Sequence, residues 1–230
     1  MPDASGKPGR DCPQCPRLMA FRHDLRRCEP DWFNAPVRSF GPITARLLIV
    51  GLAPGRKGAN RTGRPFTGDY AGDLLYDTLG RFGFARGCYG ARPDDGLALV
   101  DARITNAVRC VPPENKPTPA EIKACRSFLA PTIAEMANLR AIVTLGRISH
   151  DSTIAALDQR RSAAPFGHGA SHEVGKLRVF ASYHCSRYNT NTGVLTPDMF
   201  RDVFAAARAY LDAPSQAITS SALLSGGKTG

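Results

Sequence analysis

The order of apolar and polar stretches predicts a chain that alternates strands with helices. Residues 46–53 (RLLIVGLA) form a continuous apolar run that is followed by Pro54 and Gly55, which is typical of a buried parallel strand. Apolar segments at 101–110, 140–147 and 176–184 predict three more strands. Chains of this kind build a mostly parallel sheet with helices on both faces. We therefore expect an α/β protein of three layers, α/β/α.

The segments between these strands have helical spacing or helix-start signals. In residues 69–84, Leu74, Leu75, Leu79 and Phe82 can share one helix face. The sequence Thr-Pro-Ala-Glu at 118–121 places a capping threonine, a first-turn proline and the glutamate of a capping box in order. That helix is expected to run to about residue 138. Two further helices are predicted, one from residue 148 onward and one over 197–212, which the sequence Thr-Pro-Asp at 196–198 opens.

The length of 230 residues fits one domain, which we expect to span residues 1–212. Within it, residues 1–9 are expected to be a flexible leader. Residues 213–230 are rich in serine, glycine and alanine, which predicts a flexible tail.

The composition excludes several classes of protein. Apolar residues make up 43% and charged residues 22%, which excludes a mainly disordered chain. The longest dense apolar stretch is too short to cross a bilayer, and the polar N-terminus does not resemble a secretory signal. We therefore expect a cytoplasmic protein with no membrane partner. The formal net charge of +10 favours a polyanionic partner, with nucleic acid ahead of a membrane surface.

Four of the seven cysteines are candidate metal ligands. Cys12 and Cys15 form a C-x2-C pair, and Cys110 and Cys125 lie at the end of a predicted strand and inside the following helix. In a reducing compartment such a set favours metal binding over disulfides. Four thiolates suit a tetrahedral zinc or a [4Fe–4S] cluster, and the spacing does not separate the two. Three cysteines lie outside this set: Cys28, Cys88 and Cys185.

Residues 51–73 form a glycine-rich, basic segment after the first predicted strand. It matches neither the P-loop pattern nor the dinucleotide-binding pattern. Four basic residues of this segment are expected to contact a DNA backbone: Arg56, Lys57, Arg61 and Arg64. Phe66 can stack on a base and Asp69 can act on a water molecule, while the glycines allow a ligand to approach the backbone closely.

A histidine-containing loop follows the last predicted strand. His184 lies at the carboxyl end of that strand, where ligands of parallel α/β sheets bind. Polar residues and an aromatic residue follow it, and we expect these to contact DNA: Ser186, Arg187, Tyr188 and Asn189. Such a loop could enter a groove and fill the space left by an extruded base.

Four segments together resemble the family-5 uracil-DNA glycosylases: GLAPGRKGANRTGRPFTGD (51–69), ITNAVRCVPPENKPTP (104–119), FGHGASH (166–172) and YHCSRYNTNTGVLT (183–196). The resemblance runs from about Cys12 to Phe204. It implies an α/β/α fold and a [4Fe–4S] cluster. The cluster ligands implied are Cys12, Cys15, Cys110 and Cys125.

The resemblance also implies roles in base binding and catalysis. Phe66 would stack on the extruded base, Asn106 would bond the uracil edge, and His184 would stabilise negative charge on the leaving base. Ala53 would also belong to the base-binding residues, and it stands where the broader superfamily often has an acidic or polar residue. The water-directing role would therefore fall to Asp69 or Asn115.

Two positions depart from the family pattern. Asn106 stands where family-5 proteins often have alanine, which would narrow the substrate range towards uracil. Cys185 replaces the usual proline after the histidine, which leaves a thiol close to the site. Arg187 or Tyr188 would be the wedge that replaces the flipped base.

The activity implied is hydrolysis of the N-glycosidic bond of uracil in DNA, the first step of base excision repair. The chain is expected to act as a monomer without cleaving the strand, on nucleoid DNA of a bacterial-type cell. The sequence leaves open whether hypoxanthine, thymine or etheno bases are also substrates. Two rival hypotheses are a metal-stapled nucleic-acid-binding module without catalysis and a nucleotide-binding α/β hydrolase or transferase.

Overall fold

The computed structural model describes residues 7–214. Most of the predicted leader (1–9) and of the predicted tail (213–230) therefore lies outside the described residues. Pro8, which falls within the predicted leader, is buried beside a small cavity lined by cysteines.

A five-stranded sheet forms the centre of the fold, in the order β4-β1-β5-β7-β6. Four strands are parallel, and they are β4 (Ala102–Asn106), β1 (Leu47–Gly51), β5 (Ala141–Leu145) and β7 (Leu177–Ser182). The edge strand β6 (Ser171–Val174) runs antiparallel to β7. The predicted α/β fold with a mostly parallel sheet is therefore confirmed.

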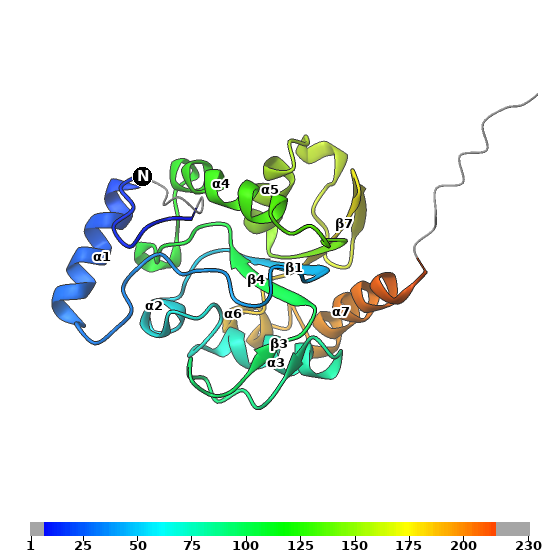
Figure 1. Ribbon diagram of the computed structural model, residues 1–230, viewed down its shortest axis with the longest axis horizontal. Helices are drawn as coiled ribbons and strands as arrows, with labels where there is room; N and C mark the ends of the chain where they lie inside the picture. Colours follow the sequence, from blue (N-terminus) through cyan, green and yellow to red (C-terminus); the bar gives the residue numbers. More distant parts are fainter. Residues whose placement is uncertain (1–6, 215–230) are drawn as a thin grey trace, which may run out of the picture.

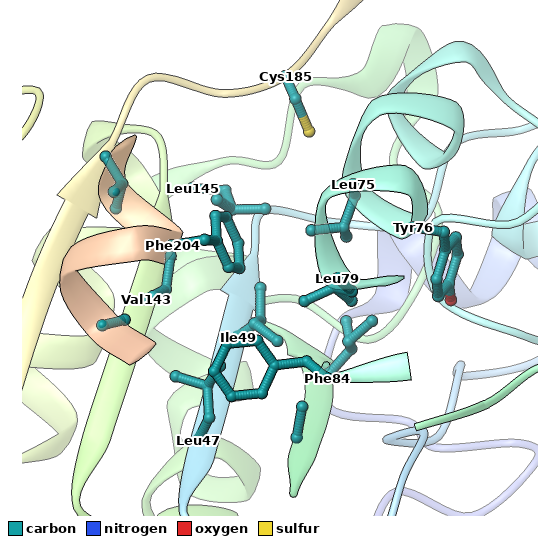
Figure 2. Close-up of a cluster of buried hydrophobic side chains, with 14 of the residues drawn as sticks. Leu47, Ile49, Leu75, Tyr76, Leu79, Phe84, Val143, Leu145, Cys185 and Phe204 are labelled. Carbon is teal, nitrogen blue, oxygen red and sulfur yellow. The ribbon is translucent and has the colours of Figure 1, made fainter. Parts of the chain in front are cut away.

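Helices cover both faces of this sheet (Figure 1). One face carries α3 (Tyr70–Arg81) and α7 (Pro197–Asp212), and the other carries α4 (Pro119–Ala134) and α5 (Arg147–Ala156). The side chains of β1 alternate between the two layers. Leu47 and Ile49 pack on the α3 and α7 side, where Figure 2 shows them beside Phe204 and Phe84, whereas Leu48 and Val50 pack on the α4 and α5 side. Burial on both faces explains why the strand is apolar at each of these positions.

Two predicted helix starts have the expected capping contacts. Thr118 accepts a hydrogen bond from the Glu121 N–H, and the Glu121 carboxylate accepts one from the Thr118 N–H, which completes the capping box of α4. Thr196 caps α7 by accepting from the Met199 N–H. The helix α4 ends at residue 134 rather than near 138.

Several short or polar elements were not predicted. They are α1 (Pro16–Cys28), α2 (Ala59–Thr62), the β2–β3 hairpin (Ala85–Arg86 and Ala98–Leu99), the 3-10 turns η1 (Pro113–Asn115) and η2 (Arg161–Ala163), strand β6 and α6 (Arg187–Asn191). The expected loop after His184 thus contains a helical turn, capped by Ser186, which accepts from the Asn189 N–H. Among residues 7–214, no helix is long and apolar enough to cross a membrane.

Candidate active site

A pocket of about 640 Å³ opens at the carboxyl ends of the parallel strands. Parallel α/β sheets place ligand sites at this edge. Ten of the residues singled out from the sequence line this pocket: Ala53, Arg56, Lys57, Phe66, Asp69, Asn106, Asn115, His184, Ser186 and Arg187. They come from segments far apart in the chain, and the sheet brings them together.

The floor of the pocket lies where β1 and β4 end side by side. The register pairs Gly51 with Asn106, and Asn106 is buried with no hydrogen-bond partner for its Oδ1 among the described residues. A Cβ atom on Gly51 would overlap that oxygen and would lie 2.6 Å from Cζ of Phe66. A glycine is therefore needed at position 51 for the amide and the aromatic ring to approach each other. The unpaired amide oxygen leaves Asn106 free to bond a ligand.

His184 faces Phe66 across the pocket. The two rings are nearly parallel, with centroids 6.0 Å apart and an angle of 27° between their planes. Burial lowers the pKa of His184 to about 4, so the imidazole is neutral at pH 7 and has one N–H to donate. The Asn189 side chain donates a hydrogen bond of 2.8 Å to the His184 carbonyl, which fixes the backbone at this point.

Asp69 occupies the N-cap position of α3, and its carboxylate lies against glycines of the preceding loop. A Cβ atom on Gly55 would lie 2.8 Å from Oδ2 of Asp69, and one on Gly58 would overlap it. Burial raises the pKa of Asp69, and the backbone N–H groups of Gly72 and Ala71 partly oppose this rise. Its Oδ1 is buried without a hydrogen-bond partner in residues 7–214. Asp69 also lines the pocket, so its carboxylate lies where the sequence predicts a group that directs a water molecule.

Asn115, the second candidate for the water, lies on the exposed rim of the same pocket. Its backbone is in the left-handed region with a φ of 58°, and the preceding Glu114 has a φ of 54°. Two such residues in succession form a tight turn that turns the chain back towards α4.

Arg187 and Tyr188, the two candidates for the wedge that replaces the flipped base, have different surroundings in the loop after His184. The Arg187 guanidinium lies 5.3 Å from the ring centroid of Tyr70, and both residues line the pocket. Tyr188 is 74% exposed. Arg187 is therefore held at the mouth of the pocket, whereas Tyr188 projects into solvent. Tyr70 was missed from the sequence, although an aromatic residue directly after Asp69 was a signal that could have found it.

The cations of the glycine-rich segment separate into two groups. Arg56 and Lys57 are exposed at the pocket, and Arg61 is exposed on α2. The hypothesis that Arg64 contacts DNA is wrong, because its side chain is 6% exposed and forms an ion pair of 2.6 Å with the buried Asp95 carboxylate. A guanidinium that is enclosed and paired in this way is not accessible to a phosphate of DNA.

The candidate metal ligands Cys12, Cys15, Cys110 and Cys125 line one small cavity beneath α1. No group of three or more histidine, cysteine, aspartate or glutamate side chains in residues 7–214 has the arrangement of a metal site. Two hydrogen bonds nevertheless point at these sulfurs. The Arg109 N–H donates to Cys125 Sγ at 3.2 Å, and the Arg22 guanidinium donates to Cys110 Sγ at 2.6 Å.

Two guanidinium groups are buried beside this cavity without a carboxylate partner in the described part of the chain. Arg22 is 1% exposed and Arg109 is 3% exposed, and Nε of each has no hydrogen-bond partner there. Burying an uncompensated charge is costly. Thiolates bound to a metal would supply the missing negative charge, so the donor set and its surroundings fit such a centre chemically.

The other cysteines are separate from this cavity. Cys28 and Cys88 are exposed. Cys185 is fully buried, and its Sγ lies 3.5 Å from the Ala71 carbonyl at the start of α3. Figure 2 shows its sulfur pointing into the apolar cluster near Leu75 and Leu145. The thiol beside His184 therefore packs in the core and does not face the pocket.

Comparison with known proteins identifies relatives over most of the chain. A model of the uracil DNA glycosylase superfamily matches residues 38–208. A type-5 uracil-DNA glycosylase of Thermus thermophilus is 44% identical over 204 residues, which is 86% of this chain and 92% of that protein. A type-5 uracil-DNA glycosylase of Mycobacterium tuberculosis is 41% identical over 86% of this chain and 77% of its own length. A type-4 enzyme of Pyrobaculum aerophilum is 34% identical over 66% of this chain and 63% of its own length.

The type-5 proteins match a larger share of the chain than the type-4 protein, and they do so at higher identity. The fold and the carboxyl-edge pocket agree with the family match, which extends across the whole sheet. The chain belongs to the uracil-DNA glycosylase superfamily and, within it, to the type-5 branch.

Proposed function

We propose that the protein is a monofunctional DNA glycosylase that hydrolyses the N-glycosidic bond of uracil in DNA, the first step of base excision repair. The observation that carries this proposal is the convergence of Phe66, Asp69, Asn106 and His184 on one pocket. The bond is unreachable inside a duplex, so the nucleotide must be flipped out, at a cost of a few kcal/mol. Uracil mispaired with guanine is flipped at lower cost than a well-paired base.

Three residues would bind the flipped base and stabilise its departure. Phe66 would stack on its face, and the unpaired amide of Asn106 would bond its polar edge. Bond cleavage leaves negative charge on the base. His184, neutral because burial lowers its pKa, would donate its N–H to the base O2 where that charge develops.

Asp69 would direct the water that attacks the sugar. Its half-buried carboxylate would also stabilise the positive charge that develops on the sugar as the bond breaks. We favour Asp69 over Asn115 because Asp69 carries a negative charge and a buried oxygen without a partner, whereas Asn115 is neutral and exposed.

The rim of the pocket would hold the DNA. Exposed cations there, Arg56, Lys57 and Arg61, would contact phosphates, and Ser186 and Asn189 would support the turn that carries the wedge. We assign the wedge to Tyr188, because its side chain is exposed whereas Arg187 is held over Tyr70. Of the lysines in residues 7–214, only Lys57 lines the pocket. It is exposed, whereas a lysine that forms a Schiff base is typically desolvated.

Cys12, Cys15, Cys110 and Cys125 would hold a [4Fe–4S] cluster. When bound, the cluster would join the segment before α1 to the segment after β4 and to α4, and its thiolates would compensate the charges of Arg22 and Arg109. We further propose that the protein acts as a monomer on DNA in the cytoplasm.

Excision from a labelled duplex with a single G:U pair, followed by hot alkali, tests the proposed activity. We expect strand breaks only after alkali, and a single-turnover rate that falls about 100- to 1,000-fold in His184→Ala and Asp69→Asn with little change in duplex affinity. Tyr210→Phe, a change on α7 away from the pocket, is the matched control. Breaks without heating would indicate strand cleavage by a lysine. Duplex binding without excision would favour the binding-module hypothesis.

The pH dependence of excision tests the neutral form of His184. Since its pKa is about 4, the rate should show no step at the ordinary histidine pKa of 6.5. The rate should fall in more acid solution, where His184 and Asp69, whose pKa burial raises, become protonated. Single-turnover rates from pH 4.5 to 8.5 check this. A rate that rises as the pH falls through 6.5 would contradict a neutral donor.

Metal analysis tests the proposed cluster independently of activity. Protein purified without oxygen should contain iron and acid-labile sulfide, each at about four per chain. Cys110→Ala should lose both and should expose the segment before α1 to proteolysis, whereas Cys88→Ala should keep both. Zinc in place of iron, or full metal content in Cys110→Ala, would overturn the assignment.

A further inference from the structure

The loop that carries Phe66 has a conformation that its own residues do not favour. Phe66 has a φ of 51°, and Gly63 and Gly68 on either side have φ values of 78° and 90°. A bulky residue in the left-handed region persists only where its surroundings hold it there. Contacts outside the loop must therefore determine where the Phe66 ring lies.

An ion pair joins Arg64, within this loop, to Asp95, which lies between β2 and β3. The two terminal nitrogens of Arg64 donate to the two oxygens of Asp95 at 2.8 Å and 2.6 Å, and Nε donates to Thr67 Oγ1 at 2.7 Å. The same carboxylate accepts the N–H groups of Gly90 and Leu97, at 2.9 Å and 3.0 Å. The Asp95 side chain is 3% exposed and each of its oxygens accepts two hydrogen bonds, so the carboxylate is enclosed and fully bonded.

Two tyrosines connect the ion pair to the backbone of Phe66. Tyr76 and Tyr89 stack with each other, and the Arg64 guanidinium lies 5.5 Å and 5.8 Å from their ring centroids. The Tyr76 hydroxyl donates to the Pro65 carbonyl at 2.6 Å, and the Tyr89 hydroxyl donates to the Phe66 carbonyl at 3.1 Å. The guanidinium therefore holds the loop directly through Thr67 and indirectly through the two phenols.

We propose that Arg64 and Asp95 are positioning residues for catalysis: they fix the Phe66 ring as the wall on which the extruded base stacks. This role rests on the proposed glycosylase function. It assigns a task to the β2–β3 hairpin, since Asp95 lies in the segment that joins its strands. The pair acts through Phe66, so its loss should impair the reaction of the flipped base while leaving the DNA-contacting surface intact.

Asp95→Asn tests the pair, with Asp94→Asn as the matched control. The control replaces the neighbouring aspartate, whose side chain is 79% exposed. We expect the single-turnover rate of uracil excision per active molecule to fall at least tenfold in Asp95→Asn and less than twofold in Asp94→Asn. Affinity for a duplex with a non-hydrolysable uridine analogue should change less than twofold in both. A purely structural role would lower the melting temperature and the active fraction, but not the rate per active molecule.

A double-mutant cycle shows whether Asp95 acts through Phe66. Phe66→Ala combined with Asp95→Asn should be no slower than Phe66→Ala alone, and Asp95→Glu should recover part of the rate. Rates that multiply independently, or an Asp95→Asn rate equal to that of the wild type, would overturn the proposal.

Hydrogen exchange separates failure of this proposal from failure of the proposed function. Residues 62–69 should exchange faster in Asp95→Asn than in Asp94→Asn whether or not the wild type excises uracil. Unchanged exchange would overturn the positioning role on its own. A wild type that lacks excision would overturn the proposed function.

Discussion

The pocket depends on the space that glycine leaves at the end of β1. Parallel pairing sets Gly51 beside Asn106, and the absence of a side chain at position 51 lets the Asn106 amide and the Phe66 ring approach each other. The absence of side chains at Gly55 and Gly58 likewise leaves room for the Asp69 carboxylate. The chemistry of the site thus rests on backbone positions that carry no functional group, since they decide whether the functional groups can approach one another.

The surplus of arginine and lysine is divided among different physical tasks. Arg56 and Lys57 are exposed at the pocket mouth, where a phosphate backbone can reach them. Arg64 is neutralised by Asp95 inside the fold, while Arg22 and Arg109 are buried beside four cysteines without a carboxylate partner among the described residues. The net charge of the sequence therefore suggests more cations at the DNA-facing surface than the structure places there. The burial of each cation and the type of its partner show what that cation does.

Much of the fold could be predicted because its signals are local. The apolar run at 46–53 and the capping threonines at 118 and 196 lie within the elements that they define, and α7 has the predicted bounds of 197–212. Strand β6 and the short α6 have too few apolar positions to give a period, so they depend on tertiary contacts. The candidate site was predictable at His184, which lies at the carboxyl end of a predicted strand. Asn106 was identified through the family resemblance, because the predicted strand ran past it to residue 110, whereas β4 ends at Asn106. The structural role of Arg64 was not predictable, because its partner Asp95 lies 31 positions away.

The Gly51→Ala variant tests most directly the claim that the site depends on the missing side chain at position 51. Its added Cβ would meet Phe66 and Asn106, whereas Gly80→Ala on α3 meets nothing within 4 Å and serves as the control. We predict that Gly51→Ala keeps the circular dichroism spectrum of the wild type but excises uracil at least 100-fold more slowly. Gly80→Ala should excise uracil at the wild-type rate. A folded Gly51→Ala protein that excises uracil at the wild-type rate would contradict the account.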